Sequence, residues 1–225
     1  SSDLLYVAIE QTKADISKCF FKEFDQDPQV LSRAHCTRLF YAQPGSSLAQ
    51  RFVSGYYDAV VWGKLFRLET LRRNDLSFLP GQVAEDFPFV ILSFMVAKRI
   101  VYVREVLYLY RKGNNQAITA NGGKMAVGIL HNLLYLHSQL QQRNFFTSGV
   151  AHAWIKSVVW SVCRFRKLSP IDRQRYEDLQ QKSWRLAKGE IKKCPFVQQL
   201  RWRLLFGLVN KCGWKSVYRW SKCFR

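Results

Sequence analysis

The six cysteines of this sequence include no CxxC pair, and its four histidines have no spacing that would complete a zinc site with them. A signal peptide is not expected either, because the chain begins SSDLLYVAIEQ, with acidic and polar residues early. The sequence therefore favours reduced cytosolic thiols over the disulfide framework typical of small secreted domains. The cysteines concerned are Cys19, Cys36, Cys163, Cys194, Cys212 and Cys223.

A long uninterrupted hydrophobic run is also lacking. The best candidate for a membrane span is residues 144–163, but His152, Lys156 and several hydroxyl side chains interrupt it. A lysine near the centre of a span costs about 2.5–3.5 kcal/mol. We therefore expect a buried amphipathic helix in this region.

Acidic residues are scarce in the second half of the chain. Residues 1–110 hold 13 Lys and Arg against 12 Asp and Glu, whereas residues 111–225 hold 22 against 4, so most of the net charge of +19 lies in the second half. That half is expected to face an anionic partner: phospholipid, nucleic acid or polyphosphate. A hydrophobic content of 48% excludes a disordered polypeptide.

The pattern of residues 1–115 predicts a mixed α/β domain. We expect Ser46 or Ser47 to cap a helix, and Phe87, Ile91 and Phe94 or Met95 to form the apolar stripe of another. That second helix begins at Glu85-Asp86-Phe87-Pro88 and is closed by Lys98-Arg99. The other expected elements are a helix over 3–13, a strand over 15–24, a turn over 25–28, a strand over 37–42, extended chain over 56–67, a short helix over 67–75, and strands or a hairpin over 99–112.

Helical patterns follow Gly122-Gly123. They cover residues 125–143, 150–168 and 169–193, the last with Ser169 or Pro170 near its start, and Cys194-Pro195 breaks the chain before the final segment. We therefore divide the chain into a domain over 1–115 and a basic amphipathic helical region over 116–225.

The pair Glu85-Asp86 is the sharpest candidate for chemistry. A carboxylate at the start of a helix can be held rigidly and stay ionised, as a general base for an attacking hydroxyl requires. The alternative is structural, because acidic residues at this position also cap a helix and complement its dipole. Spacing alone favours the structural alternative.

Residues 60–112 contain three motifs in a fixed order: W-x-K-L-F-R-x-x-x-L, then E-D-x-x-F, then Y-x-Y-R. The order resembles the second, acceptor-side half of the catalytic domain of bacterial family-2 glycosyltransferases. The resemblance implies a partial glycosyltransferase-A-like, Rossmann-like fold followed by an α-helical C-terminal region. The matching residues are Trp62, Lys64, Leu65, Phe66, Arg67, Leu71, Glu85, Asp86, Phe89, Tyr108, Tyr110 and Arg111.

The resemblance also implies roles and ligands. Asp86 would be the catalytic base, and Glu85 would bind or orient the acceptor hydroxyl. The expected substrate-binding residues are Trp62, Lys64, Arg111 and Lys112. Trp62 would lie against a sugar ring unless it is simply packed in the core, Lys64 would hold its loop or contact the acceptor, and Arg111, with Lys112, would face the diphosphate. The donor would be a nucleotide sugar and the acceptor a glycan or lipid-linked glycan.

The sequence departs from the family pattern in several places. Gly63 replaces a frequent asparagine, and Ala117 lies near the position of a frequent serine. The nucleotide-binding half and its D-x-D motif are not expected in this sequence, so the ligands of the family's divalent metal, Mn or Mg, would lie elsewhere. Asp25-Gln26-Asp27 is interpreted as a turn rather than a metal site. The chain is therefore expected to be incomplete or completed by another polypeptide.

The last segment mixes cations with aromatic residues such as Trp202, Trp214 and Trp220. Such helices lie in the headgroup layer of anionic membranes. We expect a peripheral protein on the cytoplasmic face of the membrane that acts in cell-surface polysaccharide biosynthesis. The alternatives are a packed helical subdomain with a solvated basic face, or a noncatalytic cationic module that binds membrane or nucleic acid.

Overall fold

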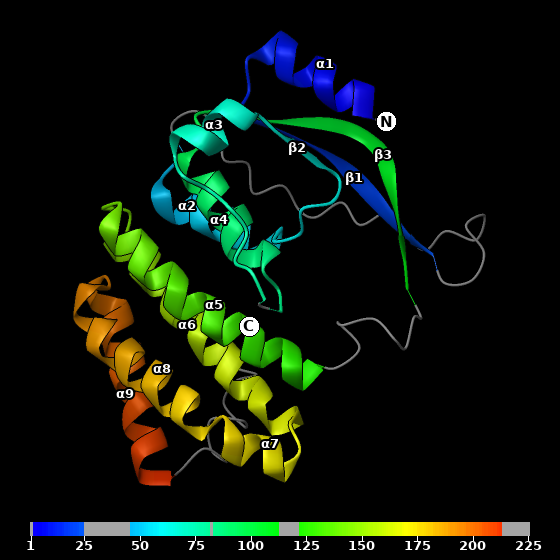
Figure 1. The fold of residues 1–225 in the computed structure, drawn as a ribbon. Coiled ribbons are helices and arrows are strands. Elements are labelled where there is room, and N and C mark those ends of the chain that lie inside the picture. Colours follow the sequence, from blue (N-terminus) through cyan, green and yellow to red (C-terminus); the bar gives the residue numbers. More distant parts are fainter. Residues whose placement is uncertain (1, 25–45, 82, 113–121, 213–225) are drawn as a thin grey trace. The chain divides into compact units, whose positions relative to one another are not determined.

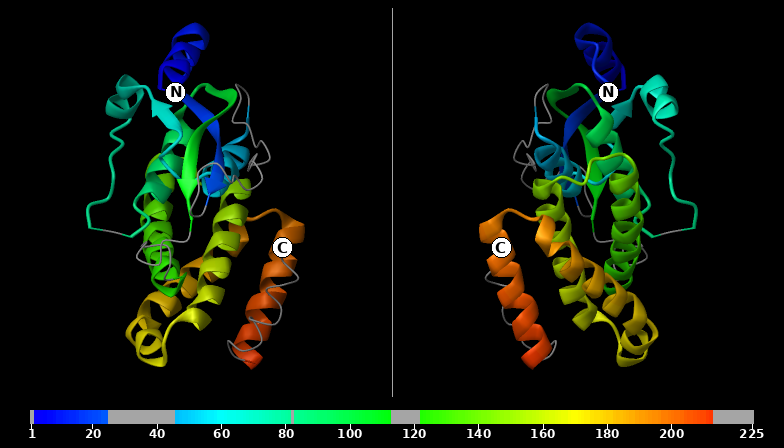
Figure 2. Two further views of the ribbon diagram at one scale, coloured as in Figure 1. Left: turned by 90° about the vertical axis from the view of Figure 1, so that its right-hand side faces the viewer. Right: turned by 90° about the vertical axis from the view of Figure 1, so that its left-hand side faces the viewer.

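The computed structural model describes residues 2–24, 46–81, 83–112 and 122–212, and it shows a mixed α/β fold with a small sheet (Figures 1 and 2). The chain forms two compact units: a sheet unit, Ser1–Gly81 with Glu85–Ala120, and a helical unit, Gln82–Ala84 with Asn121–Arg225. The domain boundary that we predicted between residues 115 and 116 lies outside the described residues.

The sheet unit contains α1 (Ser2–Thr12), β1 (Ile16–Phe24), α2 (Leu48–Tyr57), β2 (Lys64–Phe66), α3 (Leu68–Arg73), α4 (Asp86–Val96) and β3 (Ile100–Arg111). Its strands are ordered β2-β1-β3, with β1 antiparallel to β2 and parallel to β3. The predicted helix over 3–13 and strand over 15–24 are confirmed to within a residue or two. Residues 99–112 form one strand rather than a hairpin.

The strand β3 is longer than the partner beside it and is visibly curved in Figure 1. Its register against β1 shifts on either side of Phe20, so β3 carries extra residues there. Such bulges bend a strand and increase its twist. The curvature carries the last residues of β3 alongside the end of β1, up to the pair Phe24 and Arg111.

The helix α4 begins at Asp86, as predicted, but it is buried all round. Every residue from Phe87 to Met95 is buried, so the predicted one-sided stripe is wrong. The reason is that α4 packs between α2 and the sheet: Val90 and Phe94 join a core with Ile16 and Ile100. A helix that is apolar on every side can be stable only when it is enclosed in this way.

Two further expectations about α4 and its neighbours need correction. The helix ends at Val96, and Lys98 and Arg99 lie in the following loop, where their backbone N–H groups donate to the buried Asp15 carboxylate at 2.6 and 3.2 Å. The stretch 56–67 is extended only over β2. Its first residues complete α2, and Gly63, with φ of +68°, turns the chain into β2.

The helix α2 shows how local sequence fixes a boundary. The Ser47 hydroxyl accepts a hydrogen bond from the Gln50 N–H at 3.2 Å, and the Gln50 side chain accepts one from the Ser47 N–H at 2.8 Å. This capping box confirms Ser47 as the N-cap. Because a Cβ on Gly55 would lie 2.8 Å from the Ile91 Cα, the glycine lets α2 approach α4 closely.

The helical unit contains α5 (Gly122–Gln142), α6 (Ser148–Arg164), η2 (Phe165–Lys167), α7 (Pro170–Arg175), α8 (Glu177–Glu190), η3 (Ile191–Lys193) and α9 (Phe196–Cys212). The helices predicted over 125–143 and 150–168 are confirmed. The stretch 169–193 is divided into α7 and α8 at Tyr176, and Ser169 caps α7. Cys194-Pro195 separates η3 from α9, as expected.

The core of the helical unit follows the helical period. Fully buried leucines recur along α5 at Leu130, Leu133, Leu136 and Leu140. Trp154 of α6 lies fully buried against this row, and its indole N–H donates to the Leu133 carbonyl at 2.9 Å. Figures 1 and 2 show α5 and α6 side by side, which explains why the leucine row can be buried.

Several expectations concern the chain as a whole. None of the described helices is long and apolar enough to cross a membrane. Cys19, Cys163 and Cys194 are buried, and none of these three forms a disulfide. The turn expected over 25–28 and the strand expected over 37–42 lie outside the described residues.

Candidate functional site in the sheet unit

Asp86 and Glu85 lie at the N-terminal end of α4. Glu85 is exposed and makes no side-chain capping hydrogen bond to the helix, whereas Asp86 is half-buried. Burial raises the pKa of Asp86, and the Glu85 charge raises it further, while the backbone N–H groups of Phe87 and Asp86 and the charge of Lys64 oppose the rise. The result is a carboxylate that is a stronger base than an exposed aspartate.

Lys64, whose charge acts on Asp86, lies in a buried charge cluster. We define the cluster as Lys18 of β1, Asp58 after α2, and Lys64 of β2. The Lys64 ammonium lies 3.0 Å from the Asp58 carboxylate, Lys18 contacts the same carboxylate, and the lysine side chains are 2% and 4% exposed. Burial lowers the pKa of Lys64 to about 8, against the raising effect of Asp58. Lys64 also donates to the Val60 carbonyl and so holds its own loop.

The sequence patterns did not single out Lys18 and Asp58. The signal for Lys18 was available, because strand alternation places it on the same face of β1 as the core residue Ile16. A lysine on an apolar strand face is unusual unless a counter-charge meets it. Asp58 had no such signal, since it follows α2 by one residue and its position depends on how that helix packs.

Trp62 lies in an aromatic stack on β3. Its ring is stacked with those of Tyr108, at 4.5 Å and 12°, and Tyr110, at 5.1 Å and 18°, and Phe21 meets it edge-on at 4.8 Å. The tryptophan side chain is half-buried. Trp62 is therefore packed against its own unit and still partly accessible, so both predicted interpretations of this residue stay open.

Gly63 follows Trp62 in the left-handed region of backbone conformation. Asparagine adopts this region more readily than most residues other than glycine. Glycine in place of the family's frequent asparagine therefore keeps the turn that places Trp62 and Lys64. The Gly63 carbonyl accepts from the Cys19 N–H at 3.0 Å, which fixes the loop to β1. The amide side chain that asparagine would supply is lacking here.

Arg111 and Lys112 lie at the far end of β3. Lys112 forms an ion pair with Glu23 and its N–H donates to the Phe24 carbonyl at 2.7 Å, whereas Arg111 is exposed. The structure thus brings Lys64 within electrostatic reach of Asp86, and it leaves Arg111 and Lys112 at the end of the strand. Tyr110 links this end to Trp62 through the aromatic stack.

Comparison of the sequence with protein-family models and with curated proteins gives no match. A solved structure does resemble the chain: the crystal structure of S. aureus TarS 1–349 covers 100% of it, with a TM-score of 0.50 and 17% sequence identity. The chain spans 62% of that TarS chain. The chain therefore has a fold similar to that of TarS, which is a glycosyltransferase. At this identity the likeness concerns the fold alone.

A divalent metal, which the family resemblance implies, does not fit the residues that the structure describes. Across residues 2–24, 46–81, 83–112 and 122–212, no group of three or more His, Cys, Asp or Glu side chains could hold a metal ion. Asp25-Gln26-Asp27 and Ala117 lie outside these ranges.

Proposed function

We propose that this chain carries the acceptor-side part of a family-2 glycosyltransferase. It would transfer a sugar from a nucleotide-sugar donor to a glycan or lipid-linked acceptor, with inversion, in cell-surface polysaccharide biosynthesis. The observation that carries the proposal is the half-buried Asp86 carboxylate with a raised pKa at the start of α4, in a glycosyltransferase-like fold. A general base needs both a fixed position and sufficient basicity.

Asp86 acts as the base in this proposal. Its carboxylate takes the proton of the acceptor hydroxyl while the hydroxyl oxygen attacks the anomeric carbon. The bond from that carbon to the nucleotide diphosphate breaks, and the leaving group departs with the electron pair. Lys64 and the N-terminal end of α4 keep Asp86 ionised, so that it can receive the proton even though burial and Glu85 raise its pKa.

The other predicted residues have supporting roles. Glu85 is exposed beside the base and orients the acceptor hydroxyl. Trp62 presents the accessible part of its ring to a sugar, because flat aromatic rings suit the apolar faces of sugars. Arg111 is exposed at the end of β3 and offers a cation for the diphosphate, whereas Lys112 would have to leave its pairing with Glu23 to do so.

The decisive experiment compares Asp86→Asn with Asp75→Asn in the longest natural polypeptide that contains this chain. Asp75 is an exposed turn residue of the same unit, so its substitution matches the chemical change away from the site. Loss of a general base lowers turnover by about 10²- to 10⁴-fold, so Asp86→Asn should lose most transfer while Asp75→Asn keeps it. If Asp86→Asn retains more than half of wild-type turnover, Asp86 is only structural.

The pH profile provides an independent readout. A base must be ionised to work, so transfer should fall as the pH is lowered through the raised pKa of Asp86. This acidic limb should lie above the range of an ordinary aspartate and should be missing from the residual activity of Asp86→Asn. If the acidic limb of the pH profile is unchanged in Asp86→Asn, the limb reports the titration of another group.

Donor binding tests the expected incompleteness. We propose that residues 1–225 alone bind a nucleotide sugar weakly and transfer no sugar, because a bound cation or clustered donors must offset the diphosphate charge. Titration calorimetry with manganese and a panel of nucleotide sugars would measure this. Micromolar, metal-dependent binding that is lost in Asp25→Ala or Asp27→Ala would instead make Asp25-Gln26-Asp27 a metal site.

A noncatalytic cationic module is the competing function. It is favoured by one observation, the 22 Lys and Arg against 4 Asp and Glu in residues 111–225. The two functions differ in a simple assay, because only the glycosyltransferase gives donor-dependent glycosyl transfer to an acceptor.

A further inference from the structure

The helix α9 has one face in the core of the helical unit and another face exposed. On the buried face, the Phe206 ring stacks on Trp184 of α8 with 3.9 Å between centroids, and the Trp202 indole N–H donates to His152 at 3.1 Å. The exposed face carries large apolar side chains. Phe196 is 74% exposed, Val197 58%, Leu200 50% and Leu204 70%.

These four exposed residues form a continuous stripe, which we call the α9 stripe. At 100° per residue they fall within an arc of about 100° on the helix, while the buried residues Trp202, Leu205 and Phe206 lie outside that arc. Exposed apolar residues scattered singly are ordinary, but several on one face of a helix indicate a contact surface.

Cations border the α9 stripe on both sides. Arg201 and Arg203 are exposed and flank it on the helix. Arg203 also lines a cavity of about 340 Å³ with Lys188 of α8 and Lys192 of η3, and Ile191 and Phe206 are the large apolar residues of its lining. No carboxylate belongs to the lining, and Gly207, which also lines the cavity, lies on the same side of α9 as the stripe.

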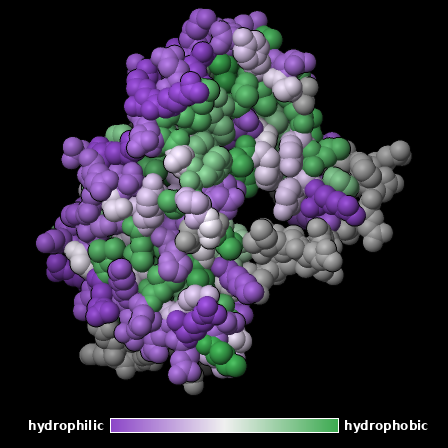
Figure 3. Space-filling model, in the orientation of Figure 1, coloured by the Kyte–Doolittle hydropathy of each residue, from purple (hydrophilic) through white to green (hydrophobic). Residues whose placement is uncertain are grey.

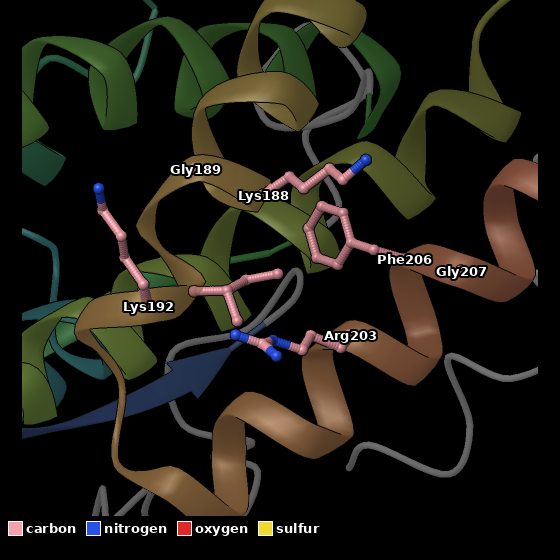
Figure 4. Close-up of a pocket in the computed structure, with 7 residues that line it drawn as sticks. Lys188, Gly189, Lys192, Arg203, Phe206 and Gly207 are labelled. Carbon is pink, nitrogen blue, oxygen red and sulfur yellow. The ribbon is translucent and has the colours of Figure 1, made fainter.

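Figure 4 shows how these cations are arranged. Lys188, Lys192 and Arg203 extend from three different elements and point in different directions, so they do not converge on one point. A site for a single phosphate would need its donors aimed at one place. Dispersed cations beside an apolar stripe fit a layer of anionic groups that overlies hydrocarbon.

We propose that α9 docks on the surface of an anionic phospholipid bilayer, with the α9 stripe inserted among the acyl chains and Arg201, Arg203, Lys188 and Lys192 among the headgroups. Amphipathic helices with a cationic border bind membranes in this orientation. The charge of the region fits the partner, since residues 121–225 hold 20 Lys and Arg against 4 Asp and Glu. Hydrophilic residues cover much of the visible surface of the helical unit in Figure 3. This inference does not depend on glycosyl transfer.

The first test is co-sedimentation of the full chain with phosphatidylcholine vesicles, with and without phosphatidylglycerol. Binding should require phosphatidylglycerol and weaken with salt, because surface attraction is screened over about 8–10 Å near physiological ionic strength. Equal binding to both kinds of vesicle would overturn the electrostatic part of the proposal.

The second test separates the stripe from general hydrophobicity. Leu200→Asp and Leu204→Asp place a charge on the stripe, whereas Ile171→Asp does the same at an 80% exposed residue of α7. All three positions are exposed, so the fold should tolerate each change. The stripe variants should lose at least about ten-fold in vesicle affinity and Ile171→Asp should not, since a charge in the apolar layer is costly. Equal losses would overturn the assignment to α9.

The third test removes single cations and compares positions at the α9 surface with a position away from it. Lys192→Gln and Arg203→Gln should each lower vesicle affinity about five-fold, the effect of one cation near an anionic surface. Arg173→Gln removes the same charge from an exposed position of α7 and should have the smaller effect. If Arg173→Gln matches the other two, total charge rather than the α9 surface determines binding.

Two other occupants of the stripe are distinguished by further measurements. If a second copy of the chain covers the stripe, Leu200→Asp and Leu204→Asp should lower the mass measured by sedimentation equilibrium and leave vesicle binding intact. If the partner is a nucleic acid, a labelled oligonucleotide should displace the chain from vesicles. The stripe variants should then bind the oligonucleotide as tightly as the unmodified chain does. Either outcome would overturn membrane docking by α9.

Discussion

In the sheet unit, Lys18 and Lys64 are buried around a single carboxylate, Asp58, whereas in the helical unit Lys188, Lys192 and Arg203 are exposed on the surface. The two halves of the chain also differ in net charge, since residues 1–110 are nearly balanced and residues 111–225 are strongly basic. The same side-chain types are thus used in opposite environments.

The difference teaches what each arrangement can do. A buried charge is costly to desolvate and must be paired, but it is fixed in place and acts strongly on a neighbour such as Asp86. An exposed cation contributes little to folding and moves freely, but many of them together attract an anionic surface over a Debye length. The sheet unit is suited to chemistry at one point, and the helical unit to recognition of an extended surface.

The largest expected effect is the loss of the shared carboxylate. Asp58→Asn leaves Lys18 and Lys64 buried without a counter-charge, and removal of one partner from a buried pair costs about 3–5 kcal/mol. The matched change Glu69→Gln breaks an exposed pair with Arg73 and should cost less than about 1 kcal/mol. Urea unfolding of both variants measures the difference; equal losses would mean that burial does not distinguish the two pairs.

The next effect is a pH dependence that belongs to Lys64. The pKa of Lys64 is lowered to about 8 in the folded chain. Above that pH the folded chain has lost the Lys64 proton while the unfolded chain still holds it. The free energy of unfolding should therefore rise as the pH increases from about 8 towards 10. One pKa unit corresponds to about 1.4 kcal/mol, so the gain is on the order of 2–3 kcal/mol. Lys64→Met should lack this gain in parallel urea titrations, whereas Lys188→Met should keep it.

Removal of a helix cap should have a smaller effect on stability, and the size of this effect should differ between the two units. Ser47→Ala should destabilise the sheet unit by about 1 kcal/mol, because the capped helix α2 is packed on α4. Ser169→Ala should cost only a few tenths of a kcal/mol, since α7 has no buried residue and its fraying exposes little apolar surface. Hydrogen exchange of α2 and α7 would measure both, and a greater loss of protection in α7 would contradict this view.

The smallest effect is expected for the exposed cations. Lys192→Gln and Arg203→Gln should change the free energy of unfolding by no more than about 0.5 kcal/mol, as is usual for surface substitutions. Thermal unfolding without lipid is the measurement. A loss above 1 kcal/mol would contradict the prediction and show that these side chains stabilise the fold.

Local sequence was enough to predict much of the fold. The helix α5 follows from leucines at helical spacing, α2 begins directly after Ser47, one of the two serines predicted as its cap, and α4 begins where acidic residues precede an apolar run. Each of these signals lies within a few residues of the element that it determines. The roles of the site residues Asp86, Glu85, Trp62 and Lys64 came instead from the family resemblance of residues 60–112, and they stay predictions.

Only the tertiary structure decided which of these residues lie together. The sequence by itself determined that the second half is basic and helical, that Asp86 begins a helix, and that Lys18 lies on a strand. It did not contain the pairing of Lys18 with Asp58, 40 positions apart, because that depends on the packing of α2 and the register of β1 against β2. It also left open which face of α9 is exposed, since Phe196 and Phe206 are both phenylalanines of one helix. Packing against α8 buries Phe206 and leaves the face with Phe196 exposed, because a helix can press only one side against a given neighbour.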